Sequence, residues 1–144
     1  MRSLLAIGIA IVLVLVFSYS YRYIEKLKTA KPSHYDQMLA FHLRQDQNLP
    51  EGLVYFIGDS HIQGLATQSV SRRSVNYGIG SDTTAGVLKR LSKYQSLKNA
   101  KAVVLGIGFN DLKERDNIQI ISNIKKILDE IPNNICTITI DFNP

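Results

Sequence analysis

A serine follows a short apolar run near the middle of the sequence. Ser60 comes after Leu53–Ile57, five apolar residues, and after Gly58-Asp59. The run is typical of a buried strand, and Asp59-Ser60 is typical of the start of a helix, here reaching about Thr67. At such a turn a serine lies at the carboxyl edge of a sheet, where helix N–H groups favour negative charge. Ser60 is therefore a candidate nucleophile or anion-binding residue, although an N-cap without chemistry has the same pattern.

Two further polar segments each follow an expected strand. One is Asn76–Thr84 and the other is Gly106–Asp111. In their order and spacing, the three segments resemble the SGNH (GDSL-type) hydrolases, a family of serine hydrolases that cleave esters. The resemblance extends from about Gly52 to the end of the chain.

This resemblance implies a role for each of the candidate residues. Ser60 matches the nucleophile, and its own backbone N–H contributes to the oxyanion hole. Asn110 matches the asparagine whose side-chain amide is a second donor. The family's oxyanion glycine corresponds to Ser81, with Gly80 one residue earlier, so the backbone donor is one of these two; Ser81 suffices if its backbone angles are ordinary. We expect Asp59 to order the turn rather than to take part in chemistry.

A base for the serine is not found in the sequence. The family uses a C-terminal Asp-x-x-His, and no such motif follows Asn110 in these 144 residues. His34 is expected at a helix start and His42 on a half-buried helix face. His61 is a poor candidate because neighbouring helical residues do not face one another. The chain therefore resembles the front two-thirds of an SGNH domain, incomplete at its C-terminus.

Strands and helices alternate along the rest of the chain. The expected strands are residues 53–57, 74–77, 101–105 and 135–142, the last containing Cys136 as a buried small hydrophobe. The expected helices are His34–Arg44, a helix capped by Asp82 or Thr83, and a helix from Asp116 whose inward residues are Ile120, Ile121, Ile124, Ile127, Leu128 and Ile131. This alternation predicts an α/β fold with a parallel sheet between two helical layers.

The N-terminus carries a long apolar segment. Ser3–Tyr21 contains no charged residue, and as a helix these nineteen residues reach about 28 Å, close to the hydrocarbon thickness of a bilayer. We expect residues 1–23 to be a signal anchor, 24–50 a linker and amphipathic helix, and 51–144 the SGNH-like domain; a cleaved signal peptide is the alternative. Lysines and arginines after the segment favour a cytoplasmic domain, whereas the resemblance favours export across a bacterial inner membrane.

Composition excludes several classes of function. Apolar content of 45% and charged content of 20% are typical of a globular protein. The net charge of +5 arises partly beside the apolar segment, and there is no aromatic and basic interleaving or zinc-ligand spacing. Cys136 is the only cysteine, so an intrachain disulfide is impossible. We therefore expect no nucleic-acid partner, no metal and no cofactor.

Three functions remain open at this point. The first is a membrane-anchored serine hydrolase of small-molecule, lipid or glycan esters. The second is a binding module of the same fold that has lost the catalytic triad. The third is a flavodoxin-like protein that binds small anions at the helix N-termini of Ser60 and Asp82, although Asp59 and Asp82 oppose anions there. The chain matches neither the Gly-x-Gly-x-x-Gly nor the Gly-x-Ser-x-Gly pattern.

Overall fold

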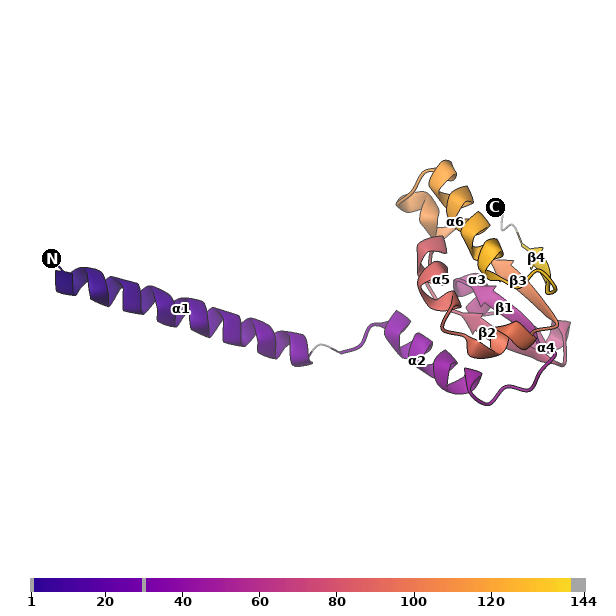
Figure 1. Cartoon of the computed structure of the whole chain (residues 1–144), viewed down its shortest axis with the longest axis horizontal. Helices are drawn as coiled ribbons and strands as arrows, with labels where there is room; N and C mark the ends of the chain where they lie inside the picture. The colour runs from indigo at the N-terminus through magenta and orange to yellow at the C-terminus, as the bar shows by residue number, and fades with distance from the viewer. Residues whose placement is uncertain (1, 30, 141–144) are drawn as a thin grey trace. The chain divides into compact units, whose positions relative to one another are not determined.

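The structure is a computed structural model that describes residues 2–29 and 31–140, without the side chains of residues 2–6 and 27–29 (Figure 1). The chain forms two compact units, residues 1–32 and 33–144. The first unit is essentially one helix, and the second contains the sheet and all the candidate site residues.

The first unit contains helix α1, Arg2–Thr29. Within it, Ile7–Lys26 is 20 residues long, has a mean hydropathy of 1.8 and contains no buried residue. By length and composition this segment is able to cross a membrane, and a signal sequence has the same properties. The helix extends beyond the expected segment at its C-terminal end.

We expect α1 to hold the protein in a bilayer, because the apolar side chains of residues 7–26 are exposed. After expression in bacteria, carbonate extraction should leave the protein in the membrane pellet. A soluble product that begins near Tyr21 would show instead that the segment is a cleaved signal peptide.

The second unit is a four-stranded parallel sheet with strand order β2-β1-β3-β4. Its strands are β1 (Val54–Gly58), β2 (Ser74–Gly78), β3 (Ala102–Gly106) and β4 (Cys136–Thr139). Its helices are α2 (His34–Asp46), α3 (Ser60–Gln63), α4 (Thr67–Val70), α5 (Thr84–Leu91) and α6 (Asn117–Glu130), with 3-10 turns η1 (Gln95–Asn99) and η2 (Asn110–Lys113).

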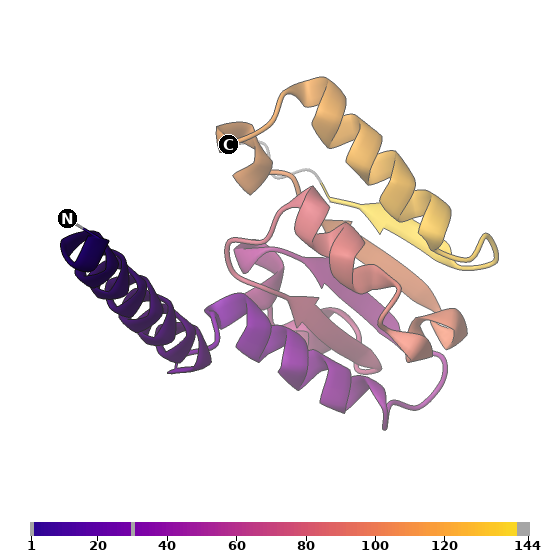
Figure 2. The same cartoon turned by 60° about the vertical axis from the view of Figure 1, so that its left-hand side comes forward.

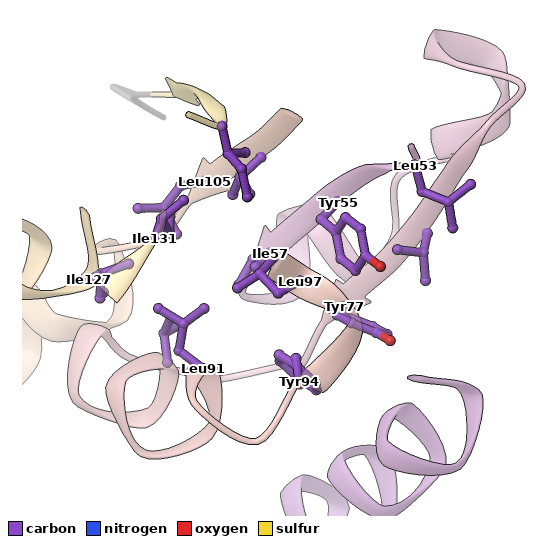
Figure 3. Close-up of a cluster of buried hydrophobic side chains, with 14 residues drawn as sticks. Leu53, Tyr55, Ile57, Tyr77, Leu91, Tyr94, Leu97, Leu105, Ile127 and Ile131 are labelled. Carbon is purple, nitrogen blue, oxygen red and sulfur yellow. The ribbon is translucent and has the colours of Figure 1, made fainter. Parts of the chain in front are cut away.

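Helices cover both faces of this sheet, which confirms the predicted three-layer α/β fold. Figure 2 shows α2, α5 and α6 in front of the sheet. The main core lies under them, where alternate strand residues such as Tyr55 and Ile57 meet Leu91 and Ile127 (Figure 3). The opposite face carries a smaller cluster that includes Phe56 and Ile62 of α3.

The three longer helices of this unit begin at side-chain caps. Ser33 and Asp36 form a reciprocal capping box at the start of α2, and Asp116 and Gln119 form another at the start of α6. The Thr83 side chain accepts a hydrogen bond from the Gly86 N–H at the start of α5. Of the two predicted caps for α5, Thr83 is therefore the one used.

The helix after Ser60 is shorter than the sequence predicts. It ends at Gln63 instead of about Thr67. The side chain of Asn76 donates hydrogen bonds to the carbonyls of Ile62 (2.7 Å) and Leu65 (3.0 Å), which satisfies carbonyl groups where α3 ends. The early end of α3 thus goes together with hydrogen bonds from a β2 side chain, and local sequence patterns do not indicate such a contact.

Two side chains predicted to be buried are exposed. Cys136 is exposed. It lies on β4, the edge strand, where it pairs with Ala102. On this face of the sheet, α3 contacts β1 and β2 and α4 contacts β2. Ile121 lies on the outer side of α6 and is 53% exposed. Of the last predicted strand, residues 141 and 142 lie outside the described residues.

Helix α2 is joined to the core by buried polar side chains. His42, predicted to be half-buried, is only 1% exposed, and its Nδ1 lies 3.3 Å from the Tyr94 hydroxyl. The Tyr77 hydroxyl donates to Asp46 Oδ1 at 3.0 Å. Burial, assisted by the nearby Arg90 guanidinium, lowers the pKa of His42 to about 4.

The free energy of unfolding should therefore fall as pH drops from about 6.5 towards 4. In this range unfolded chains bind a proton at His42 and folded chains do not, which costs on the order of 3 kcal/mol at the acidic end. Urea unfolding at several pH values should show a shallower pH dependence for His42→Gln than for the wild type. Equal slopes would mean that His42 is not held neutral.

Candidate active site

The three motif segments meet at one edge of the sheet. In the strand register, Gly58 of β1 lies beside Gly78 of β2 and Gly106 of β3. Ser60 and Gly80 each follow two residues after their glycine, and Asn110 follows four residues after Gly106. The chain leaves β1 for β2 on one side and later returns to β3 on the other, so the site lies at the topological switch point. Ligands bind at such positions in open parallel sheets.

Ser60 is the first residue of α3 and is exposed. Asp59 precedes it as the N-cap and is completely buried. Its Oδ1 accepts hydrogen bonds from the His61 N–H at 2.9 Å and lies 3.0 Å from His61 Nδ1. Asp59 therefore orders the turn, as the sequence predicts, and also orients the neighbouring imidazole.

The His61 ring lies towards the segment that carries Asn110. It meets the Phe109 ring edge-on, with ring centroids 5.5 Å apart. The His61 side chain is 42% exposed. An imidazole with an Asp59 carboxylate at Nδ1 is thus adjacent in sequence to Ser60 and in contact with the β3 side of the site.

The segment after β2 has an unusual backbone at Ser81. Its φ is +62°, in the left-handed region, so the condition of ordinary backbone angles that was set for Ser81 is not met. Glycine adopts this conformation without steric cost, which explains why glycine is expected at this position. The neighbouring Gly80 N–H donates to Gln63 Oε1 at 2.5 Å.

Asn110 joins the β2 and β3 sides of the site. It begins η2, and its Nδ2 donates to the carbonyl oxygen of Asp82 at 2.9 Å. An asparagine amide has two N–H groups, so this bond leaves a second donor. The side chain of Asn110 thus touches the residue next to Ser81, which brings two of the predicted site residues together.

Asp111 is a buried residue that connects the same loops. Its structural role is not indicated by the sequence pattern. Its carboxylate accepts from the Thr84 N–H (2.8 Å) and from the Thr84 hydroxyl (2.6 Å). It also pairs with Arg115 at 3.2 Å. Asp111 therefore fixes the start of α5 to the segment that carries Asn110.

Arg90 is the largest side chain that is completely buried in the described part of the chain. Its Nε donates to Asp82 Oδ2 at 2.8 Å, and its Nη2 donates to the Gly58 carbonyl at 3.1 Å. Its Nη1 donates to the Tyr77 carbonyl at 2.9 Å and to the Tyr94 hydroxyl at 2.7 Å. Burial raises the pKa of the Asp82 carboxyl, and the Arg90 guanidinium opposes that rise.

The sequence pattern does indicate that Arg90 is buried. Arg90 lies three residues after Val87 and four before Tyr94, and both of these are core residues. Helical periodicity therefore places Arg90 on the buried face of α5. A buried arginine needs acceptors, and here they come from the ends of strands β1 and β2, from Asp82 and from Tyr94.

The histidines are distributed unevenly around the site. His34 begins α2, as predicted, and its Nε2 lies 3.5 Å from Gln63 Oε1. His42 is buried against Tyr94 and Tyr77, away from this sheet edge.

The described residues contain no group of three or more His, Cys, Asp or Glu side chains suited to a metal ion. A hollow of about 280 Å³ lined by residues including Leu91 and Pro132 contains none of the candidate site residues.

Comparisons with solved structures show the same fold. A Streptococcus pneumoniae structure described as a platelet activating factor matches with a TM-score of 0.67 and 19% identity, over 86% of this chain and 59% of that one. A Bacteroides fragilis acylhydrolase matches with a TM-score of 0.63 and 22% identity, over 76% and 58%. A GDSL-like lipase from Bacteroides thetaiotaomicron matches with a TM-score of 0.60 and 18% identity, over 70% and 56%.

The sequence itself matches no protein-family model and no curated protein. The chain spans less than two thirds of the length of the three solved structures. Its motifs resemble those of the SGNH hydrolases, and its fold matches these structures with TM-scores of 0.60 to 0.67. The chain therefore has the fold of the SGNH (GDSL-type) hydrolases.

Proposed function

We propose that this protein is a serine ester hydrolase of the SGNH type. The observation that carries the proposal is the convergence of the Ser60, Ser81 and Asn110 segments at the carboxyl ends of three adjacent strands, with Asn110 bonded to Asp82. Ser60 Oγ attacks the acyl carbonyl carbon and its proton passes to a base. The carbonyl oxygen becomes the oxyanion, which collapses as the alcohol leaves with a proton and the acyl group stays on Ser60 Oγ. Water then attacks this acyl-serine, the carboxylic acid is released and Ser60 Oγ regains its proton.

In this proposal three groups donate hydrogen bonds to the oxyanion: the Ser60 N–H, the remaining Nδ2 hydrogen of Asn110 and one backbone N–H after β2. For the last we assign Ser81 rather than Gly80, because the Gly80 N–H is already donated to Gln63. The left-handed backbone of Ser81 supports the same choice, since glycine is expected there.

The proton acceptor is the incomplete part of the site. None of the 144 residues supplies an Asp-x-x-His after Asn110. His61 is oriented by Asp59 and is adjacent to Ser60, whereas His34 contacts α3 through Gln63. Without a base a serine is a poor nucleophile at neutral pH, so we expect the chain alone to be a weak catalyst.

The fold and the N-terminal segment support a proposal for the substrate class. The similar structures include an acylhydrolase and a lipase, which favours a small-molecule, lipid or glycan ester here. We propose residues 1–23 as a membrane anchor, 24–50 as linker and amphipathic helix, and 51–144 as the hydrolase-like domain, placed outside a bacterial inner membrane. A non-catalytic binding module of the same fold is the alternative.

Hydrolysis of p-nitrophenyl butyrate separates these functions. We expect the chain alone to act barely above background, and added imidazole to increase hydrolysis in the wild type more than in Ser60→Ala, because imidazole supplies the base. Equal stimulation of both proteins would contradict a role for Ser60 as nucleophile. Vigorous hydrolysis without imidazole that requires Ser60 would show that a histidine of this chain already serves, and His61→Ala and His34→Ala would identify it.

A further inference from the structure

Ser81 is the only non-glycine residue with positive φ in the described part of the chain. Left-handed backbone is unfavourable for a residue with a side chain, because Cβ crowds the following carbonyl oxygen. Such a conformation persists only where the surrounding structure fixes it, and it is concentrated at functional sites. The contacts on either side of Ser81 therefore show what holds it.

Backbone contacts restrain the chain before and after Ser81. The Gly80 N–H donates to Gln63 Oε1, and the Asp82 N–H donates to the Ile79 carbonyl at 3.1 Å. The Asp82 carbonyl accepts from Asn110 Nδ2. These hydrogen bonds fix the position of the turn. Two of them are made by the ends of side chains, those of Gln63 and Asn110.

The Asp82 side chain is restrained more firmly. It is 4% exposed, its Oδ1 accepts from the Thr83 N–H at 2.9 Å, and its Oδ2 accepts from Arg90 Nε at 2.8 Å. Gly86 leaves the room for this carboxylate, because a Cβ there would lie 1.8 Å from Asp82 Oδ1. Asp82 can therefore hardly move without breaking its bond to Arg90.

Arg90 connects this carboxylate to the two strands that lead to the site. Its guanidinium also donates to the Gly58 carbonyl, two residues before Ser60, and to the Tyr77 carbonyl, four residues before Ser81. The strand that leads to Ser60 and the strand that leads to Ser81 are thus both hydrogen-bonded to one rigid, planar guanidinium group. Lysine cannot replace it, since an ammonium group has no fork of donors.

We propose that Arg90, acting through Asp82, is a positioning residue that holds Ser81 in its left-handed conformation and aims the Ser81 N–H towards Ser60. The part that concerns the backbone of Ser81 is independent of any activity. The part that concerns the direction of the N–H rests on the proposed function, in which this group is an oxyanion donor.

NMR of the full chain in nanodiscs tests the first part. At positive φ the N–H and Hα hydrogens of one residue lie close together, so Ser81 should give a strong intraresidue N–H to Hα cross-peak. We expect Arg90→Lys to weaken this cross-peak to the intensity of ordinary loop residues, and Lys89→Met, an exposed neighbour on α5, to leave it unchanged. An unchanged cross-peak in a folded Arg90→Lys protein would overturn the proposal.

Phosphonylation of Ser60 by a fluorophosphonate tests the second part. We expect Arg90→Lys to slow the rate constant of the bonding step about tenfold to a hundredfold with little change in the affinity for the probe, because a displaced donor affects the transition state. Ser81→Gly introduced into Arg90→Lys should restore most of this loss, since glycine adopts positive φ without support.

These outcomes separate the two proposals. A slow Arg90→Lys protein that Ser81→Gly does not restore would overturn the positioning role, because Arg90 would then act on the fold alone. If Ser60 is not phosphonylated in the wild type with imidazole present, the proposed function fails, and the cross-peak of Ser81 still decides whether Arg90 holds the backbone.

Discussion

Replacing Asn110 with alanine should slow the Ser60-dependent hydrolysis of p-nitrophenyl esters about a hundredfold to a thousandfold. This is the usual effect of removing one oxyanion donor. The loss should appear in kcat rather than in KM, because the donor acts on charge that develops only in the transition state. The measurement is steady-state hydrolysis with imidazole supplied, after subtraction of the Ser60→Ala rate.

A matched asparagine separates this effect from a general one. Asn117 begins α6 and is exposed, so Asn117→Ala should retain the wild-type rate. Asn110 also donates to the Asp82 carbonyl, and thermal unfolding should therefore confirm that Asn110→Ala is folded. A folded Asn110→Ala protein with the wild-type kcat would remove Asn110 from the oxyanion site.

Replacing Arg90 with methionine should lower the free energy of unfolding by about 3–5 kcal/mol. The substitution keeps much of the volume but leaves the Asp82 carboxylate buried without its charge partner. It also removes donors from the carbonyls of Gly58 and Tyr77. Urea unfolding of the full chain, followed by circular dichroism, gives the difference from the wild type.

Lys89→Met is the control, since Lys89 is the preceding residue of α5 and is exposed. Its free energy of unfolding should stay within about 0.5 kcal/mol of the wild type. A loss of less than 1 kcal/mol for Arg90→Met would mean that the buried pair contributes little net stability, as apolar replacements of buried ion pairs sometimes show.

The fold was predictable because its signals are local. Apolar runs such as Leu53–Ile57 and Ala102–Leu105 end in glycine, and helices with apolar faces separate them. This alternation fixes a parallel sheet, and the carboxyl ends of parallel strands necessarily share an edge. The expectation that Ser60, Ser81 and Asn110 lie at one edge followed directly, and the strand register confirms it.

What the sequence did not reveal depends on contacts between distant segments. Arg90 has its acceptors at Gly58, Tyr77 and Asp82, and no local pattern indicates that they converge. The left-handed Ser81 was missed because propensity alone assigns serine an ordinary backbone. Cys136 was assigned to the interior because its apolar neighbours indicate a strand but not whether that strand lies at an edge.

The central claim is that Ser60 is a nucleophile, and mass spectrometry of the phosphonylated chain tests it most directly. A fluorophosphonate loses fluoride when a serine Oγ attacks its phosphorus, which leaves a stable adduct on that residue. The intact wild-type protein should gain one adduct, imidazole should accelerate its formation, and peptide fragmentation should place it on Ser60. Ser60→Ala should gain none. An adduct that forms equally in Ser60→Ala, or a wild type that remains unmodified with imidazole present, would contradict the assignment.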